Sequence, residues 1–231
     1  MKIVCWNMGC GFGAGGYRKH HRAALDWLHA QGPDVALLQE VELAALDCLE
    51  DMVVHLVRTS TGGITGNAIA TTGAALDPVP VEIDGALVAA ARTHLRGVDF
   101  IFTSAHVLTD GKEHKGRQRR ALGSFVAKLA DVVARGRCII GGDFNASLRW
   151  PEYGDWFFAP MLAAGFHDTR PHTDEIQSYW GRGSTSVIQD DHVFVDPLTK
   201  LAVSRGSWAI MSGEDHRRWS DHGPVVVEAV E

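Results

Sequence analysis

The segment Cys138-Ile139-Ile140-Gly141-Gly142-Asp143-Phe144-Asn145-Ala146-Ser147, CIIGGDFNAS, places two polar side chains directly after a short apolar run. The apolar residues are typical of a buried strand, and the two glycines let that strand end tightly and let backbone or substrate come close. Asp143 and Asn145 are two residues apart, so in extended backbone they point to the same side. Gly-Asp and Asn are also common in turns, so the segment alone does not distinguish a site from a turn.

Other predicted strands also meet polar residues at one end. VCWN ends at Asn7, VALLQE at Glu40 and FTSAH at His106, QDDHVFV begins with Asp190 and Asp191, and WSDHGPVVVE carries Asp221 and His222 at its start. Unpaired polar groups are costly in buried strands, and strand ends can converge on one rim of a sheet to form a site. We therefore expect these side chains to lie close together.

The chemistry of this set is specific. Carboxylate and amide oxygens suit Mg²⁺ or Mn²⁺, and the histidines can donate hydrogen bonds to an anion. No serine or cysteine nucleophile stands beside a histidine in these motifs. The inventory predicts metal-assisted attack of water on a phosphate ester. Carboxylates would hold the cation, the histidines would help neutralise phosphate oxygens, and a carboxylate would take a proton from water.

The length and layout of the chain predict one α/β domain over residues 1–231. The 231 residues are 45% hydrophobic and 22% charged, which is ordinary for a globular protein with a substantial core. We see no internal repeat or linker, and many short strands with about three helices favour two packed sheets with helices outside. Helices are expected at about 17–30, 116–134 and 156–164, and the later strands at 177–180, 192–195, 201–204 and 224–230.

Six short motifs occur in the order seen in one superfamily. They are Trp6-Asn7, Gln39-Glu40, Ser104-Ala105-His106, Gly142-Asp143-Phe144-Asn145, Asp191-His192-Val193-Phe194-Val195 and Ser220-Asp221-His222-Gly223-Pro224-Val225. The chain resembles the endonuclease/exonuclease/phosphatase superfamily, which includes DNase I-like nucleases, abasic-site endonucleases, sphingomyelinases and inositol-phosphate phosphatases. The resemblance runs from residue 3 to about residue 228. It implies a four-layer α/β sandwich with two central mixed β-sheets flanked by helices.

The resemblance also implies the metal site and the residue beside the attacking water. Asn7, Glu40 and Asp221 match residues on the metal side, with Glu40 as the principal ligand of Mg²⁺ or Mn²⁺. Asp143 matches the residue that activates or positions water, and Asn145 matches the one that orients Asp143 and the phosphate. Whether one or two metals act, and which group is the base, stays open.

Three further positions complete the implied catalytic set. His106 matches a residue that contacts the phosphate, and His222 matches the histidine that contacts the scissile phosphate. Asp191 matches the carboxylate that orients this histidine. Its neighbour Asp190 is the competing assignment, and Asp191 is preferred because Val193-Phe194-Val195 then follows as the family strand does.

These matches imply a Mg²⁺-dependent phosphodiesterase, and we expect a nuclease that acts on DNA. The alternative is a phosphatase or phosphodiesterase of a small-molecule or lipid phosphate ester. A nucleotide-binding module that uses the GxGxxG match at residues 11–16 is the alternative from another class. Arg117, in a basic cluster that is either a phosphate-gripping patch or a solvated face, and Trp180, an aromatic near the motifs, are the expected substrate contacts.

Charge and composition limit the partners. The net charge of −6 and the pI of about 6.0 do not suggest a protein that coats nucleic acid through bulk positive charge. No cysteine pair has CxxC spacing, so no zinc site is expected. The first residues lack the pattern of a signal peptide, and no apolar run is long enough for a membrane helix. We expect a cytoplasmic monomer with free thiols and no membrane segment.

Overall fold

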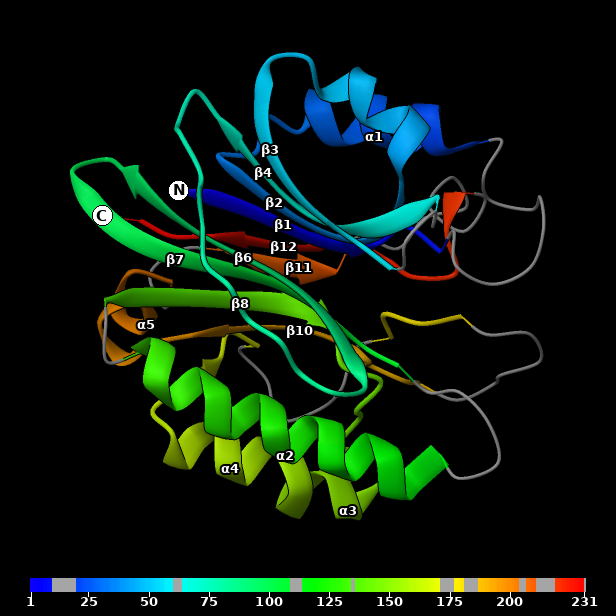
Figure 1. Cartoon of the computed structure of the whole chain (residues 1–231), viewed down its shortest axis with the longest axis vertical. Helices are drawn as coiled ribbons and strands as arrows, with labels where there is room; N and C mark the ends of the chain where they lie inside the picture. Colours follow the sequence, from blue (N-terminus) through cyan, green and yellow to red (C-terminus); the bar gives the residue numbers. More distant parts are fainter. Residues whose placement is uncertain are drawn as a thin grey trace.

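The computed structural model describes residues 1–9, 20–59, 64–108, 114–133, 136–170, 177–180, 187–203, 207–210 and 219–230. Two six-stranded sheets lie face to face, with helices on the outer side of each (Figure 1). This confirms the four-layer α/β sandwich that the motifs predicted. The glycine-rich stretch 11–16 lies outside the described residues.

The first sheet has the strand order β11-β12-β1-β2-β4-β3. Its strands are β1 (Lys2–Asn7), β2 (Val35–Glu42), β3 (Met52–Arg58), β4 (Thr65–Thr72), β11 (Trp208–Ile210) and β12 (Val225–Glu228). β1 and β2 are parallel, and the other neighbours are antiparallel. Helix α1 (His21–Ala30) covers the outer face with Ala24, Leu25 and Leu28 buried, and the 3₁₀ helix η2 (Leu43–Leu49) lies beside it.

The second sheet has the strand order β5-β6-β7-β8-β10-β9. Its strands are β5 (Asp77–Pro78), β6 (Ala86–Leu95), β7 (Val98–Val107), β8 (Arg137–Asp143), β9 (His167–Asp168) and β10 (Asp191–Val195). β7 and β8 are parallel. Helix α2 (His114–Val133) covers this sheet with a buried apolar stripe that includes Leu122, Phe125 and Leu129. Beside α2 lie α3 (Pro151–Tyr153), a π-helical turn η3 (Gly154–Phe158) and α4 (Ala159–Ala163).

The core between the sheets draws on both of them. Ile3 and Leu37 from the first sheet and Phe102, Ile139 and Val193 from the second are fully buried in one apolar cluster. Because side chains alternate along a strand, each strand gives every second residue to this layer and the others to the helix-covered face. The two sheets are therefore fixed against each other, and with them the polar residues at their rims.

Two parallel strand pairs bring three of the predicted site residues, Asn7, His106 and Asp143, to one rim. Asn7 ends β1 beside Gln39 of β2, and His106 lies opposite Asp143 on β7 and β8. Parallel neighbours end at the same edge of a sheet, which explains why these positions converge. Asp191 begins the antiparallel strand β10 opposite Asp143, so it starts at the same rim.

Two of the predicted later strands are wrong. Residues 201–204 were expected as a strand, but the chain forms helix α5 (Pro197–Val203) there. Asp196 accepts hydrogen bonds from the backbone N–H groups of Leu198 and Thr199, and Pro197 occupies the first turn, which is a strong helix start. At 177–180 the structure has only an isolated bridge between Tyr179 and His222.

The helical segment expected at 156–164 begins earlier, with α3. The π-helical turn η3 then separates α3 from α4. Pro160 follows this turn within α4 and lacks the N–H group that a regular helical bond would need. Among the described helices, none combines the length with the apolar character that crossing a membrane requires.

Candidate active site

Asp143 lies at the centre of the rim, at the end of β8, and is almost fully buried. The backbone N–H of Asn145 donates to its Oδ1 at 2.9 Å, and the side-chain amide of Asn7 donates to its Oδ2 at 2.8 Å. Both oxygens of Asp143 are thus held in fixed positions by donors from two different strand ends.

Two histidines face Asp143 from separate parts of the chain. The Nε2 atoms of His106 and His222 each lie 3.7 Å from Oδ2 of Asp143. His106 also lies 3.6 Å from Oε1 of Glu40, measured from the same nitrogen. The rim therefore brings together two carboxylates and two imidazoles, all with little exposed surface.

The ring of His222 is oriented by Asp191. Nδ1 of His222 lies 2.8 Å from Oδ2 of Asp191, and the hydroxyl of Ser178 donates to that same oxygen at 2.7 Å. Burial alone would lower the pKa of His222, but the carboxylates of Asp191 and Asp143 raise it well above its ordinary value. Ser178 belongs to no sequence motif, and its contact with Asp191 becomes visible only in the fold, where Ser178 is completely buried.

The segment that carries His222 is tied to the end of β1. The indole N–H of Trp6 donates to the carbonyl of His222 at 2.9 Å. The hydroxyl of Ser220 donates to the carbonyl of Asn7 at 2.7 Å and accepts the backbone N–H of His222 at 3.0 Å. The two residues Trp6 and Ser220 in the sequence motifs thus support the histidine rather than meet a substrate.

Glu40 lies in an irregular part of β2. The pairing of β2 with β4 shifts register between Leu38 and Val41, and Glu40 has a φ of 50°. A bulge re-aims side chains locally, and a non-glycine residue in the left-handed region stores strain that is often found at functional sites. The irregularity accounts for a buried carboxylate at the rim of an otherwise apolar strand.

A layer of polar side chains joins the two sheets just below the rim. The amide of Gln39 donates to the hydroxyl of Ser104 at 2.9 Å, and this hydroxyl donates to the carbonyl of Leu38 at 2.8 Å. Asn67 donates to the carbonyl of Leu87 at 2.9 Å. Buried polar groups that are hydrogen-bonded, as Gln39 and Ser104 are, rigidify a core. Gln39 and Ser104 occur in the sequence motifs, but the motifs do not predict that these two side chains join the two sheets.

The site residues fit a divalent cation. The side chains of Asp143, Asp191 and His222 each offer a ligand atom within 4.8 Å of one another. The hydrogen bond between Asp191 and His222 uses Oδ2 of the carboxylate and Nδ1 of the ring, so Oδ1 of Asp191 and Nε2 of His222 take no part in it. Oδ1 of Asp190 and Oδ1 of Asp191 are buried without a hydrogen-bond partner.

The electrostatics point the same way. Burial and the nearby charge of Asp143 raise the pKa of Asp190 to about 8. The shift comes first from burial and then from repulsion by the Asp143 carboxylate, which a nearby cation would relieve. Hard oxygen donors of this kind are the ligands that Mg²⁺ and Mn²⁺ prefer. The donor set of the rim therefore matches the cation that the sequence predicts.

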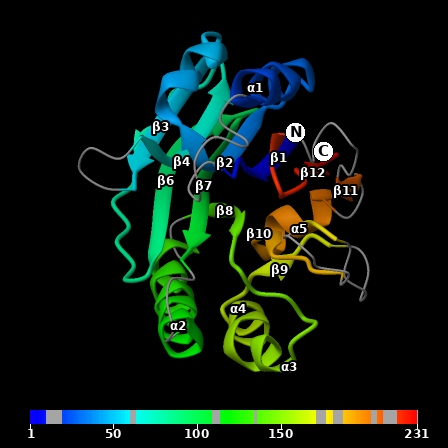
Figure 2. The same ribbon diagram turned by 90° about the vertical axis from the view of Figure 1, so that its right-hand side faces the viewer.

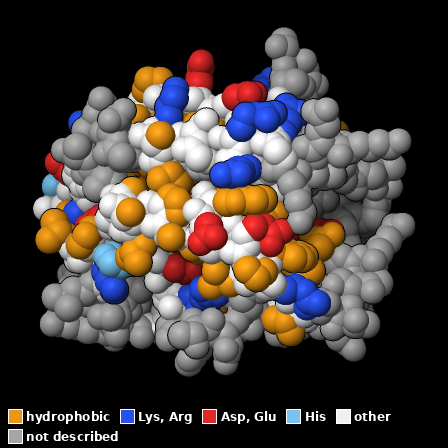
Figure 3. All heavy atoms as spheres, turned by 90° about the horizontal axis from the view of Figure 1, so that it is seen from below, with side chains coloured by type: hydrophobic (Ala, Val, Ile, Leu, Met, Phe, Trp, Pro, Cys, Tyr) orange, Lys and Arg blue, Asp and Glu red, His pale blue; other side chains and the backbone are white. Residues whose placement is uncertain are grey.

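Three predicted residues lie outside this central group, namely Asp221, Arg117 and Trp180. Asp221 is half-buried, and in the described part of the chain its carboxylate makes no hydrogen bond or ion pair, although its carbonyl accepts the N–H of Trp180 at 2.8 Å. Arg117 is exposed on α2. Figure 3 shows the face that α2, α3 and α4 cover, where Lys and Arg side chains are interspersed with acidic and hydrophobic ones.

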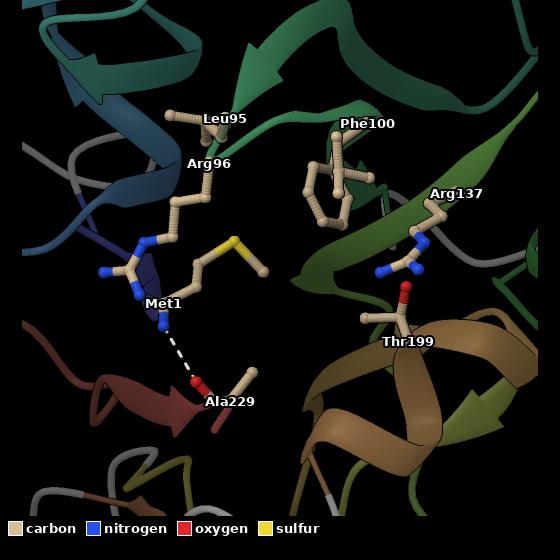
Figure 4. Close-up of a pocket in the computed structure, with 8 residues that line it drawn as sticks. Met1, Leu95, Arg96, Phe100, Arg137, Thr199 and Ala229 are labelled. Carbon is tan, nitrogen blue, oxygen red and sulfur yellow. Dashed lines mark hydrogen bonds between the residues drawn. The ribbon is translucent and has the colours of Figure 1, made fainter. Parts of the chain in front are cut away.

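A separate pocket lies at the opposite end of the sheets. It has a volume of about 340 Å³ and is lined by residues that include Leu95, Arg96, Phe100 and Arg137 (Figure 4). Arg96 is paired with Asp34 at its margin. None of the predicted site residues lines this pocket, so it is distinct from the rim that holds Asp143.

Comparison with known proteins agrees with this geometry. The sequence profile of the Endonuclease/Exonuclease/phosphatase family matches residues 4–222. No curated protein sequence matches the chain. Among solved structures, truncated TDP2 of Caenorhabditis elegans superposes with a TM-score of 0.74 at 14% identity, over 100% of this chain and 97% of that one.

Two other similar structures carry different activities in their names. A 3'-5' exonuclease from Neisseria meningitidis has a TM-score of 0.68 and 18% identity, and both chains are covered completely. A mannosyl-6-phosphatase from Bacteroides thetaiotaomicron has a TM-score of 0.69, also at 18% identity and with complete coverage of both chains. At these identities the likeness establishes the fold alone. Together with the family match over nearly the whole sequence, it shows that the chain belongs to the Endonuclease/Exonuclease/phosphatase family of phosphoesterases.

Proposed function

We propose that this protein is a divalent-metal-dependent phosphodiesterase that cleaves nucleic acid, with DNA as its substrate. The observation that carries the proposal is the arrangement around Asp143. Its two oxygens are fixed by Asn7 and Asn145, while the Nε2 atoms of two histidines lie 3.7 Å away. A fixed carboxylate beside two imidazoles suits proton transfer from water and the stabilisation of a charged phosphate.

In this proposal Asp143 accepts a proton from the attacking water. The donors from Asn7 and Asn145 aim its two oxygens. His222 is protonated, because Asp191 and Asp143 raise its pKa, and donates a hydrogen bond to a phosphate oxygen. His106 donates to a second phosphate oxygen from the opposite side. Asn145 helps to orient both Asp143 and the phosphate.

Glu40 is the principal ligand of the cation in this proposal, with Asn7 and Asp221 on the same side. When bound, Mg²⁺ or Mn²⁺ supplies Lewis-acid polarisation of the phosphate and lowers the pKa of water. Asn7 has a second task here, because its amide group donates to Asp143. The strained backbone of Glu40 keeps its carboxylate at the rim near His106.

The preference for DNA rests on less specific features. Arg117, Arg119 and Arg120 are exposed along one turn of α2, and the guanidinium of Arg119 lies 5.1 Å from the centre of the Trp156 ring. Such basic and aromatic groups suit a nucleic-acid backbone. The second candidate is a small phosphate ester, favoured by the mixed charges in Figure 3 and by the similar fold of a mannosyl-6-phosphatase.

Nicking of supercoiled plasmid DNA in the presence of Mg²⁺ or Mn²⁺ tests the proposal. Metal-dependent nicking that EDTA abolishes, and that is absent from the folded Asp143→Asn variant, is the expected result. If the protein releases phosphate from sugar phosphates but leaves plasmid intact, the second candidate replaces the first. Nicking that persists in EDTA would contradict the metal requirement.

Replacing Glu40 by glutamine should raise the Mg²⁺ concentration needed for half-maximal activity by roughly tenfold or more. The scale is that reported for perturbing a metal site by one group, and the amide has no charge to offer the cation. Direct Mn²⁺ binding, followed by electron paramagnetic resonance, should weaken in parallel. Glu228→Gln, an exposed change at the end of β12, is the control for lost charge. Equal titrations for both variants would argue against Glu40 as a ligand.

Replacing Arg117, Arg119 and Arg120 by glutamine should weaken DNA binding and flatten its dependence on salt. Each lost phosphate contact removes about 0.9 from the slope of log K against log salt concentration, so the three together remove up to about 3. The matched control replaces Arg92, Arg96 and Arg137, which lie in the half of the second sheet away from the rim. Equal slopes for the two triple variants would mean that the α2 arginines form a solvated face and do not contact the phosphates.

A further inference from the structure

A hydrogen-bonded chain joins helices α2 and α3 to the turn that follows Asp143. The side-chain amide of Gln118 donates to the backbone carbonyl of Asn145, and its Oε1 accepts the hydroxyl of Tyr153 at 2.7 Å. Gln118 is 3% exposed and Tyr153 is 7% exposed. Both ends of a buried polar side chain are thus committed to specific partners between the helix layer and the active-site rim.

We infer that Gln118 and Tyr153 are positioning residues of the active site, which hold Asn145 and, through it, Asp143. The inference rests on the function proposed above, because Asp143 has its catalytic task only in that proposal. Neither residue belongs to a sequence motif of the site.

The backbone of Asn145 explains why such a support is needed. Its φ is 49°, in the left-handed region that a non-glycine residue adopts at a cost. Its N–H donates to Oδ1 of Asp143, and its carbonyl accepts from Gln118. Only the φ and ψ angles of Asn145 therefore separate its hydrogen bond to Asp143 from its hydrogen bond to Gln118. Fixing the carbonyl fixes the direction in which the N–H meets the carboxylate of Asp143.

Tyr153 determines which end of the Gln118 amide faces Asn145. A carbonyl accepts only, so it needs the NH₂ group of the glutamine, and a hydroxyl that donates to Oε1 fixes that orientation. Burial, followed by the charge of Asp190, raises the pKa of Tyr153, so its hydroxyl keeps its proton. The Tyr153 ring is itself packed edge-on against Trp150 and Trp156. The support is therefore rigid from the helix layer to the rim.

The side chain of Asn145 makes a separate bond to the second sheet. Its amide donates to the carbonyl of Val107 at 3.0 Å. This bond places the side chain but leaves the carbonyl of Asn145 to Gln118. Removing Gln118 would thus release the backbone of the turn while its side-chain anchor remains. We expect a small displacement of Asp143 rather than loss of the fold.

The test compares Gln118→Met and Tyr153→Phe with Val126→Ala. Methionine keeps the length of glutamine but cannot donate to Asn145. Val126 is a buried residue of the same helix, so its truncation costs stability without touching the chain of hydrogen bonds. The first readout is kcat and KM for DNA cleavage at saturating Mg²⁺. The second is hydrogen exchange at the amide of Asn145 compared with amides of β7 and β8, which requires no activity.

We expect Gln118→Met to lower kcat roughly tenfold with little change in KM, and Tyr153→Phe to lower it about threefold. One lost hydrogen bond to a buried group has this scale. Exchange at Asn145 should rise about tenfold in Gln118→Met, while the β7 and β8 amides keep their protection. Val126→Ala should lose stability with kcat unchanged.

Three results would overturn the inference. One is unchanged exchange at Asn145 in Gln118→Met, and another is an equal rise at every core amide, which means global destabilisation. The third is an equal loss of kcat in Val126→Ala. A wild-type protein that does not cleave DNA would refute the proposed substrate, but the exchange rates would still decide whether Gln118 holds the turn.

Discussion

Replacing Asp143 by asparagine is expected to lower the rate of phosphodiester cleavage by at least ~10²-fold, the scale for a lost acid–base group. The amide cannot take a proton from water, and one of its two positions becomes a donor. Asn7 and Asn145 both donate to this side chain, so one of their hydrogen bonds must also break. The loss should appear in single-turnover rates with saturating metal, which separates chemistry from binding.

The Asp143→Asn protein should remain folded. The lost acceptor is costly, but the charge of Asp143 is one of the causes that raise the pKa of buried Asp190 to about 8, so its removal relieves repulsion. Thermal unfolding measures the balance of the two effects. The control Asp99→Asn changes an exposed carboxylate that pairs with His94, and it should keep full activity. A folded Asp143→Asn protein with a rate within tenfold of wild type would remove Asp143 from the proposed mechanism.

Replacing Gly142 by alanine should destabilise the protein by about 3 to 5 kcal/mol, more than most single substitutions. An ideal Cβ at this position would lie 2.0 Å from the carbonyl oxygen of Ala105 and 2.8 Å from its carbonyl carbon. Both contacts are with backbone, which cannot rotate away, and Ala105 is paired with Gly142 in the ladder of β7 and β8. The two strands would have to separate next to the active site.

Chemical denaturation provides the measurement, with Gly123→Ala as the matched control. Gly123 lies on the exposed side of α2, and no atom is within 4 Å of its ideal Cβ. This change should be neutral or stabilising by about 0.5 to 1 kcal/mol, because glycine is a poor helix residue. Denaturation midpoints that agree between wild type and Gly142→Ala would contradict the close approach of β7 and β8 at this position.

The rim residues were predictable because each stands at one end of a recognisable strand. Asn7, His106 and Asp143 stand at the ends of apolar runs, and the parallel pairing of those strands brings the ends to one edge. Asp191 was preferred to Asp190 from the strand that follows it, and it is the residue that hydrogen-bonds to His222. Their catalytic and metal-binding roles remain predictions for the experiments above.

The supporting residues could not be predicted, since their roles depend on contacts between distant segments. Ser178 meets Asp191, and Gln118 meets Asn145, only after loops and helices have packed on the sheets. The prediction of a strand at 201–204 was wrong for a local reason. It relied on the apolar residues there and overlooked the helix start at Asp196 and Pro197. Apolar runs of this length do not by themselves separate a strand from a short helix.

The joining of the first and last strands sets the moment at which the site can exist. β1 pairs with β12, and the Trp6 indole and the His222 carbonyl meet across 216 residues of sequence. During synthesis, β1 leaves the ribosome long before its partner and must wait with one edge exposed, which is a hazard for aggregation. Contacts this distant in sequence also make folding slow. A growing chain therefore cannot assemble the rim around Asp143 until the segment with His222 and β12 has been made.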